Sequence, residues 1–340
     1  MTPAAVERGE RVAVLMSTGL IERIFSARDR SRLRAAGAVR LPAVDAIGLP
    51  DLTAIGPETE VVVTGWDSPA LAVEILDHAP KLRLIAHTGG SIRAIVPAEV
   101  YDRGVAVTTV SAVLADAVAE FTAMAMIAGL RRATLLHERM RRGDDWESLA
   151  AEAPGRLLRA QTVGLVGASR VGRAVIGLLA GFGCRVLVSD PFLTPDDASQ
   201  LGVELVTFHN LLTLSDVVSL HAPVLPETRR MIGAAELARM RDGALLINTA
   251  RAALLDASAV LNAVRSGRLS AVLDVFDQEP LPPDSPWRHL ENAMVTPHIA
   301  ALTVETLRAQ GEAVVDEIER FRAGESLVGE ISREMYDRIA

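Results

Sequence analysis

The stretch that decides the fold runs from Thr162 to Gly172 and reads TVGLVGASRVG. Its first five residues form an apolar run that predicts a buried strand, and the residues from Arg173 to Phe182 predict a helix. A glycine-rich turn between a strand and a helix presents backbone N–H groups at the positive end of the helix dipole, where a pyrophosphate binds well. The stretch therefore predicts a dinucleotide-binding unit of the Rossmann type.

Within this turn, we expect Gly167 to make the tight bend and Gly172 to let the helix pack closely on the strand. Ser169 stands where the fingerprint has its middle glycine, and it is tolerated if its side chain turns away from the pyrophosphate. Asp190 follows the next predicted strand, roughly 20 residues after the last glycine, as expected for the carboxylate that binds the adenosine ribose. This carboxylate would repel a 2′-phosphate and so favours NAD over NADP; the alternative is an aspartate that caps the turn before Pro191.

Length and composition predict about two globular domains. The chain has 340 residues, of which 49% are hydrophobic and 23% charged, and its net charge is −8, which disfavours nucleic acid as a partner. The single cysteine, Cys184, excludes an internal disulfide and is expected to be a buried thiol. Met1 to Arg11 lack the apolar core of a signal peptide, and we see no run of about 18 apolar residues. We therefore expect a cytoplasmic protein with no membrane partner.

Strand-like runs alternate with helical patterns along the chain, which is typical of parallel α/β sheets. A helical pattern at Pro69–Asp77 lies among the first strands, a long one runs from about Val113 to Met140, and the last runs from about Val304 to Arg322. Two sheets are expected, with strands at Arg11–Met16, Val61–Thr64, Leu82–Ala86 and Val105–Thr108 in the first, and at Thr162–Val166, Val186–Ser189, Val203–Val206, Val217–Leu220, Ala244–Asn248, Ala271–Val275 and Met294–Thr296 in the second.

Three strand ends of the second sheet carry charged residues that a core does not need. Arg251 follows one strand, and its guanidinium can hold a carboxylate through two parallel hydrogen bonds. Glu279 and His298 follow two others, and a carboxylate beside an imidazole makes a proton carrier. Ligands of open α/β sheets bind at the carboxyl ends of the strands, so these residues are expected to converge. The alternatives are a capping role for His298 and a surface ion pair for Arg251.

These motifs, in their order and spacing, resemble the D-isomer-specific 2-hydroxyacid dehydrogenase family, and the resemblance covers almost the whole chain. It is carried by the segments Gly167–Gly172, Ser215–Pro223 with Glu227–Thr228, Asn248–Arg251, Leu273–Phe276 with Glu279–Pro280, and Thr296–Ile299.

The resemblance implies an NAD-dependent oxidoreductase that interconverts a 2-oxo acid and a D-2-hydroxy acid, usually as a homodimer. Residues 113–302 would form a Rossmann-type NAD-binding domain with a doubly wound parallel sheet. Residues 1–112 and 303–340 would form a discontinuous, smaller, flavodoxin-like α/β substrate-binding domain. Arg251 would bind and polarise the substrate, His298 would be the acid/base and Glu279 its partner. The implied dinucleotide contacts are Gly167, Ser169, Arg170, Val171 and Gly172, Asp190 at the ribose, Asp274 at the nicotinamide carboxamide, and Ala222, Thr228, Thr249 and Ala250 elsewhere.

The chain departs from the family pattern in its substrate loop, which reads HTGGSIR from His87 to Arg93. The backbone N–H groups of Gly90 and Ser91 can still hold a carboxylate, whereas Arg93 replaces an acidic position. It is either an additional handle for an anion or part of an interdomain contact. Three tryptophans at positions 66, 146 and 287 either shape the substrate pocket or anchor an interface.

A non-catalytic NAD-sensing protein, similar to corepressors related to the family, is the alternative to the enzyme. Such a protein binds the dinucleotide and recruits partners without turning over a substrate. No cluster of His, Cys and carboxylate side chains has the spacing of metal ligands, so no metal is expected.

Overall fold

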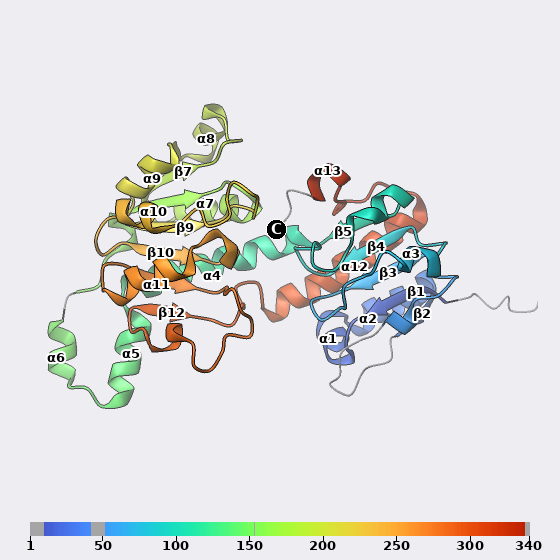
Figure 1. Cartoon of the computed structure of the whole chain (residues 1–340), viewed down its shortest axis with the longest axis horizontal. Coiled ribbons are helices and arrows are strands. Elements are labelled where there is room, and N and C mark those ends of the chain that lie inside the picture. Colours follow the sequence, from blue (N-terminus) through green and yellow to red (C-terminus); the bar gives the residue numbers. More distant parts are fainter. Residues whose placement is uncertain (1–9, 42–51, 153, 337–340) are drawn as a thin grey trace, which may run out of the picture. The chain divides into compact units, whose positions relative to one another are not determined.

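The structure is a computed structural model that describes residues 10–41, 52–152 and 154–336, and the chain divides into two compact units (Figure 1). Unit 1 consists of Met1–Leu114 and Thr303–Ala340, and unit 2 consists of Ala115–Leu302. The prediction about a signal peptide concerns mainly residues 1–9, which lie outside the described residues.

Unit 1 is built on a parallel sheet whose described strands follow the order β2-β1-β3-β4-β5. This is the flavodoxin-like order, in which the chain reverses direction across the sheet between β1 and β3. The sequence predicted four of the five strands to within two residues and missed the short β2. The strands are β1 (Glu10–Leu15), β2 (Ala38–Arg40), β3 (Val61–Thr64), β4 (Leu84–His87) and β5 (Ala106–Thr109).

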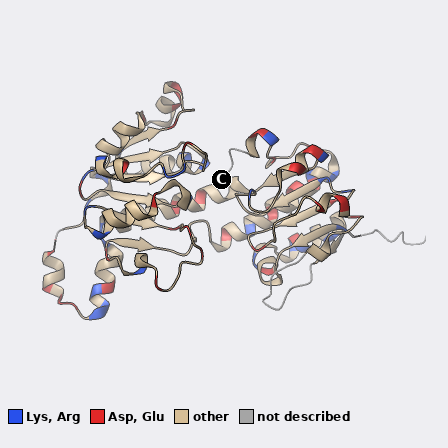
Figure 2. Cartoon of the chain, in the orientation of Figure 1, with Lys and Arg blue, Asp and Glu red and all other residues tan. Residues whose placement is uncertain are grey.

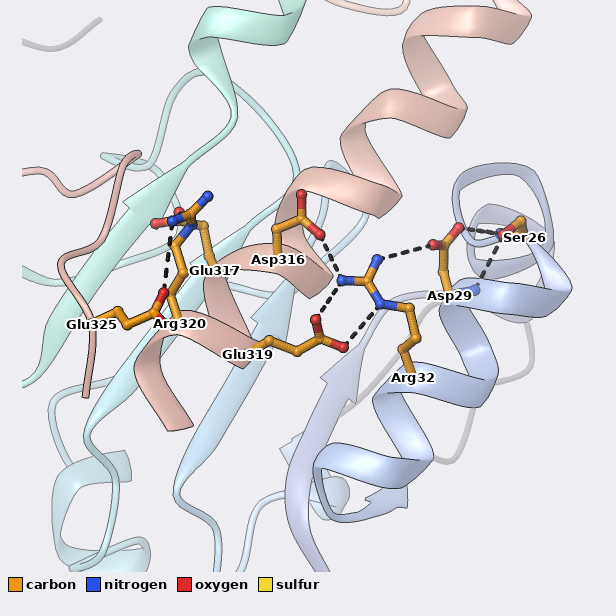
Figure 3. Close-up of polar contacts among 8 residues, drawn as sticks. All are labelled: Ser26, Asp29, Arg32, Asp316, Glu317, Glu319, Arg320 and Glu325. Atoms are coloured by element: carbon orange, nitrogen blue, oxygen red, sulfur yellow. Dashed lines mark hydrogen bonds and ion pairs between the residues drawn. The ribbon is translucent and has the colours of Figure 1, made fainter. Parts of the chain in front are cut away.

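Helices cover this sheet, and α12 is the longest of them in unit 1. It packs against α1, α2 and β4. Arg32 on α2 fixes the contact, because its guanidinium bonds the carboxylates of Asp316 (2.6 Å) and Glu319 (2.5 Å) on α12 (Figure 3). The helices are α1 (Thr18–Ile24), α2 (Ala27–Ala36), α3 (Ile75–His78), α12 (Val304–Ala323) and α13 (Arg333–Tyr336), with 3-10 turns η1 (Leu52–Ala54) and η2 (Ala98–Arg103).

Unit 2 contains the second parallel sheet, with the described strands in the order β12-β11-β10-β9-β6-β7-β8. The order of a Rossmann fold reverses in the same way on either side of its first strand, here β6. The predicted doubly wound α/β architecture is therefore confirmed. The strands are β6 (Thr162–Val166), β7 (Arg185–Ser189), β8 (Glu204–Leu205), β9 (Val217–Leu220), β10 (Leu245–Asn248), β11 (Ser270–Leu273) and β12 (Ala293–Val295).

Each face of the unit 2 sheet has its own apolar core, since a parallel sheet must be covered on both sides. One core contains Leu165 and residues of α4 and α7, and the other contains Leu246 and residues of α9, α10 and α11. Charged side chains avoid most of the strands, which are largely tan in Figure 2. The helices are α4 (Ser111–Leu130), α5 (Ala133–Arg142), α6 (Trp146–Ala151), α7 (Arg170–Ala180), α8 (Pro195–Leu201), α9 (Phe208–Leu214), α10 (Ala234–Arg239) and α11 (Ala257–Arg265), with η3 (Leu158–Ala160), η4 (Ala252–Leu254) and η5 (Pro286–His289).

The prediction of one long helix from Val113 to Met140 is wrong, because the chain forms α4 and α5 with a break between them. Arg132 adopts a positive φ of 51° at the break. The amide of Arg156 donates to the carbonyl of Leu130, so the end of α4 bonds to a distant segment in place of a next helical turn. A tertiary contact thus ends a helix that the local composition would continue.

The predicted helix at Pro69–Asp77 is also largely wrong, since only α3 at its end is helical. The amide of Leu71 donates to the carbonyl of Ile95 at 2.7 Å, which ties the first part of this segment to another loop. Helix α7 begins at Arg170 rather than Arg173, because Ser169 caps it.

Helix α4 is long and apolar enough to cross a membrane by length and composition, and it is the one such helix among the described residues. Ala119, Met126 and Leu130 of this helix are buried in the core of unit 2. Thr122, fully buried, lies 3.1 Å from Thr249 through the two hydroxyl oxygens. These contacts are those of a core helix.

Two buried histidines and the single cysteine have shifted pKa values. Burial lowers the pKa of His87 and of His221 to about 4, so both imidazoles are neutral near pH 7. His87 Nδ1 lies 2.9 Å from the hydroxyl of Thr64. Cys184 is half-buried rather than buried, and desolvation raises the pKa of its thiol.

These histidines predict a loss of stability in acid. An unfolded histidine titrates near pH 6.5, so between roughly pH 4 and 6.5 the unfolded state binds more protons than the folded state. The free energy of unfolding therefore falls as the pH drops through this window, by on the order of 3 kcal/mol for each fully buried histidine. His221→Gln should flatten this dependence in urea unfolding followed by circular dichroism at pH 4.5 to 7. Equal pH slopes for the variant and the wild type would contradict the assignment.

Candidate active site

The glycine-rich turn has the geometry of a phosphate-binding turn, and its glycines are sterically required. Gly167 has a positive φ of 98°, and a Cβ there would lie 2.9 Å from the backbone nitrogen of Ala222. A Cβ on Gly172 would lie 2.3 Å from the carbonyl oxygen of Gly167. Side chains at these positions would collide with the protein backbone, so glycine allows the turn, the start of α7 and the segment after β9 to pack closely. The turn lies where β6 and β9 end, at the point where the strand order reverses.

Ser169 is the N-cap of α7 and not an obstacle to a ligand. Its hydroxyl accepts a hydrogen bond from the amide of Gly172 at 3.3 Å, which turns the side chain toward the helix. By helix geometry, the first N–H groups of a helix have no carbonyl acceptor within the helix itself. The start of α7 is therefore a helix terminus of the kind that suits an anion, although the middle glycine is missing.

Asp190 follows β7 and is bonded to the same turn. One carboxylate oxygen accepts from the amide of Ala168 at 2.7 Å, and the other accepts from the amide of Phe192 at 2.8 Å. Each carboxylate oxygen has a further lone pair for a ribose hydroxyl. The structure thus brings the turn and the acidic residue together, in the arrangement that suits the adenosine half of a dinucleotide.

The loop after β9 lies against the glycine-rich turn. The backbone of Ala222 packs on Gly167, and the hydroxyl of Thr228 donates to the carbonyl of Pro223 at 2.6 Å, which closes the loop on itself. His221 is buried, with Nε2 3.0 Å from the Ser219 hydroxyl and with no partner for Nδ1 among the described residues. No role for His221 follows from the sequence alone.

Arg251 lies in a tight turn after β10 that Asn248 holds. The side-chain amide of Asn248 donates to the carbonyl of Arg251 at 2.9 Å and accepts from the amide of Ala250 at 3.1 Å. The guanidinium donates to the carbonyl of Ala250 at 2.7 Å. Burial lowers the pKa of Arg251, and the negative charge of Glu279 counteracts this effect. Asn248 is a functional candidate that the sequence shows as part of the motif Asn248–Arg251, without indicating a role for its side chain.

His298 and Glu279 form the expected pair. Nδ1 of His298 lies 2.8 Å from Oε2 of Glu279, and the other carboxylate oxygen accepts from the amide of Phe276 at 2.9 Å. The carboxylate therefore orients the ring and leaves Nε2 as the nitrogen that can exchange a proton with a substrate. The His298 side chain is 51% exposed, so this nitrogen can be reached by a ligand.

A pocket of about 560 Å³ lies against this pair. Its lining combines the two titratable side chains with apolar ones, as is usual for small-molecule sites. The lining residues are Phe276, Glu279, Pro280, Leu281, Arg288, Val295, Thr296, Pro297 and His298.

Asp274 stands between the two turns and is fully buried. Its carboxylate accepts hydrogen bonds from the hydroxyl of Thr296 (2.5 Å), the amide of Ile299 (2.9 Å) and the amide of Ala300 (2.8 Å). His298, in the middle of this loop, has a positive φ of 54°. Unit 2 thus brings together Arg251, Glu279 and His298 with the predicted dinucleotide residues.

The predicted substrate loop belongs to unit 1. It follows β4, where Gly90 and Ser91 are half-buried and Arg93 is exposed. A Cβ on Gly89 would lie 2.5 Å from Nε2 of His87 and 2.9 Å from Nε1 of Trp66, so a larger residue there would displace these rings. The two side chains therefore pack closely against the loop that follows β4. Over residues 10–41, 52–152 and 154–336, no group of three or more His, Cys, Asp or Glu side chains could hold a metal ion.

Comparison with known proteins places this site. The family described as "D-isomer specific 2-hydroxyacid dehydrogenase, NAD binding domain" matches residues 123–300. A glyoxylate reductase of Korarchaeum cryptofilum is 38% identical over 257 residues, which cover 74% of this chain and 76% of that protein. The TT0316 protein of Thermus thermophilus shares the fold with a TM-score of 0.80 and 31% identity, over 95% of this chain and 100% of that one.

A D-3-phosphoglycerate dehydrogenase of Mycobacterium leprae is 34% identical over 270 residues, 79% of this chain. The match spans only 50% of that longer protein.

The chain belongs to the D-isomer specific 2-hydroxyacid dehydrogenase family. It is an NAD-dependent oxidoreductase of 2-oxo and 2-hydroxy acids that acts on a CH–OH group. The residues of unit 2 fit NAD, because the glycine-rich turn joins β6 to the start of α7 where the strand order reverses, and Asp190 is bonded to this turn. The compared relatives are reductases and dehydrogenases and give no support to a non-catalytic sensor.

The turn predicts a selective effect of glycine substitution. Gly172→Ala forces the helix away from the Gly167 carbonyl, at a cost of about 1–3 kcal/mol, and should weaken NADH binding by roughly tenfold or more. Gly177→Ala in the same helix is the matched control, since nothing lies within 4 Å of its Cβ. It should leave the Kd of NADH unchanged and stabilise the protein by up to about 1 kcal/mol. Fluorescence titration with NADH checks both, and equal Kd values for the two variants would refute the steric argument.

Proposed function

We propose that the protein reduces a small 2-oxo acid to the D-2-hydroxy acid with NADH, using Arg251, Glu279 and His298. The observation that carries this proposal is the His298–Glu279 bond of 2.8 Å in the same unit as the glycine-rich turn. Bound NADH supplies the hydride. The remaining tasks, holding the acid and delivering a proton to its carbonyl oxygen, belong to side chains of this chain.

Arg251 holds the substrate and polarises its carbonyl group. A guanidinium offers N–H groups in a fixed fork that matches a carboxylate or a carbonyl oxygen. Its partial burial strengthens such a bond, because water competes less with the substrate. The backbone amides of Gly90 and Ser91 are the second proposed anchor for the substrate carboxylate, with Arg93 nearby in sequence as a handle for a further anionic group.

His298 donates the proton in reduction and accepts it in oxidation. The carboxylate of Glu279 keeps Nδ1 of His298 engaged, so that the exchanged proton is carried on Nε2.

The proposed NAD contacts all lie in unit 2. The amides at the start of α7 bind the pyrophosphate and Asp190 binds the adenosine ribose. The full set is Gly167, Ser169, Arg170, Val171, Gly172, Asp190, Ala222, Thr228, Thr249, Ala250 and Asp274.

We also propose a homodimer built through the NAD-binding unit and a place in the cytoplasm. None of the residues of α5 is buried, and Met140 of that helix and Trp146 of α6 are exposed. Exposed apolar surface of this kind is typical of protein contacts.

We also assign residues 113–302 to the NAD-binding domain. The substrate-binding domain consists of residues 1–112 and 303–340.

Substitutions of the three proposed catalytic residues should change different kinetic constants. His298→Asn, which tolerates the positive φ, should lower turnover by roughly 10²–10⁴-fold because it removes the proton donor. Arg251→Ala should chiefly raise KM for the acid. Glu279→Gln removes the carboxylate that orients the imidazole of His298, so it should lower turnover while His298 is still present.

These effects are measured by NADH oxidation with a panel of 2-oxo acids, with NADH binding titrated separately as the control. Wild-type turnover in His298→Asn would refute the mechanism. No turnover of any acid by the wild type would refute the proposed function.

Asp190 predicts a preference for NADH over NADPH. A 2′-phosphate would face its carboxylate, and its two oxygens are fixed by backbone amides and cannot swing away. Asp190→Asn keeps an acceptor for the Ala168 amide. It should lower the ratio of kcat/KM with NADH to kcat/KM with NADPH by roughly tenfold, which corresponds to a loss of about 1.4 kcal/mol in discrimination between the two cofactors. Equal efficiency of the wild type with both cofactors would disprove the assignment.

A further inference from the structure

Two fully buried polar side chains stand at neighbouring strand ends of unit 2. Asn248 is the last residue of β10, and Asp274 comes directly after β11. The amide of Asp274 donates to the carbonyl of Asn248 at 3.0 Å, so the two residues are joined through the backbone. Buried polar groups need partners, and the partners of these two lie in the turns that carry the reactive residues.

The side-chain amide of Asn248 has the donor and the acceptor that the backbone of the Arg251 turn needs. Its side chain donates to the carbonyl of Arg251 and accepts from the amide of Ala250. A carboxamide offers both a donor and an acceptor in this place, whereas a carboxylate would face the carbonyl with a second acceptor.

The chemistry of Asp274 matches the His298 turn. Three donors point at its carboxylate, from Thr296 on one side of His298 and from Ile299 and Ala300 on the other. Such a set requires an acceptor-only group. The bonds hold His298 in a left-handed backbone conformation that residues other than glycine rarely adopt.

We propose that Asn248 and Asp274 are positioning residues for the reaction: Asn248 sets the place of the Arg251 guanidinium, and Asp274 sets the place of the His298 imidazole. The proposal rests on the roles proposed for Arg251 and His298. For Asp274, it adds a task to the proposed contact with the carboxamide of NAD.

The first test compares Asn248→Asp with Asn292→Asp. Asn292 also donates to backbone carbonyls, those of Val264 and Leu269, but it precedes β12 at the amino end of the sheet. Asn248→Asp should raise KM for the 2-oxo acid by roughly tenfold or more, with a smaller fall in kcat and with the Kd of NADH unchanged. Asn292→Asp should leave all three values near those of the wild type.

The second test compares Asp274→Asn with Asp216→Asn. Asp216 accepts from the amide of Thr162 at 2.8 Å, at the opposite ends of the strands. An asparagine at 274 turns an N–H toward one donor, so kcat should fall by roughly tenfold or more at saturating NADH. The imidazole resonances of His298, recorded by NMR without cofactor and assigned with His298→Asn, should shift in Asp274→Asn and stay unchanged in Asp216→Asn.

Thr296→Val is the milder variant, because it removes one bond to Asp274 and leaves the carboxylate intact. It should lower kcat and shift the His298 resonances in the same direction as Asp274→Asn, with NADH binding unchanged.

Three results would overturn the proposal. The first is an Asp274→Asn variant that binds NADH weakly but has wild-type kcat at saturation, with unchanged His298 resonances. The second is a Thr296→Val variant that leaves both kcat and the resonances unchanged, and the third is kinetic identity of Asn248→Asp and Asn292→Asp. If the wild type reduces no 2-oxo acid, the proposed function fails, whereas the resonances still decide whether Asp274 positions His298.

Discussion

The backbone N–H and C=O groups of turns at buried strand ends need hydrogen-bond partners, and the site depends on this constraint. In a parallel sheet covered on both faces, buried strands such as β10 and β11 end where backbone N–H and C=O groups must find partners within the protein. Asp274 meets this demand for the His298 turn with one carboxylate, and Asn248 meets it for the Arg251 turn with one carboxamide. Stability and the placement of reactive groups are thus served by the same bonds.

The same principle operates at the dinucleotide crevice. Asp190 satisfies the amide of Ala168 in the glycine-rich turn, and Ser169 satisfies the amide of Gly172 at the start of α7. Side chains organise the backbone, and the organised backbone presents its remaining amides to an anion. A serine in place of the middle glycine fits this scheme, because a hydroxyl can cap the helix without entering the ligand's space.

Much of the architecture could be predicted because it follows from local patterns of the sequence. Apolar runs of three to five residues predicted all seven described strands of unit 2, and a strand followed by a glycine-rich turn and a helix predicted the Rossmann unit. The failures were helices. The break at Arg132 and the loss of helix at Pro69–Asp77 come from hydrogen bonds with Arg156 and with Ile95, which are distant in sequence. Helix propensity is a local property of the sequence and does not include such distant contacts.

The sequence by itself determined the fold class and indicated the residues proposed here as reactive, because strand patterns, glycine positions and the family's motifs are properties of contiguous segments. Only the tertiary structure decided how these residues are held. The bond between His298 and Glu279, the burial that makes His221 neutral, and the pairing of Asn248 with the Arg251 turn depend on atoms that the folded chain brings together. The physical reason is that desolvation and hydrogen-bond geometry are set by what surrounds a side chain in space, whereas residue type and spacing are fixed along the chain.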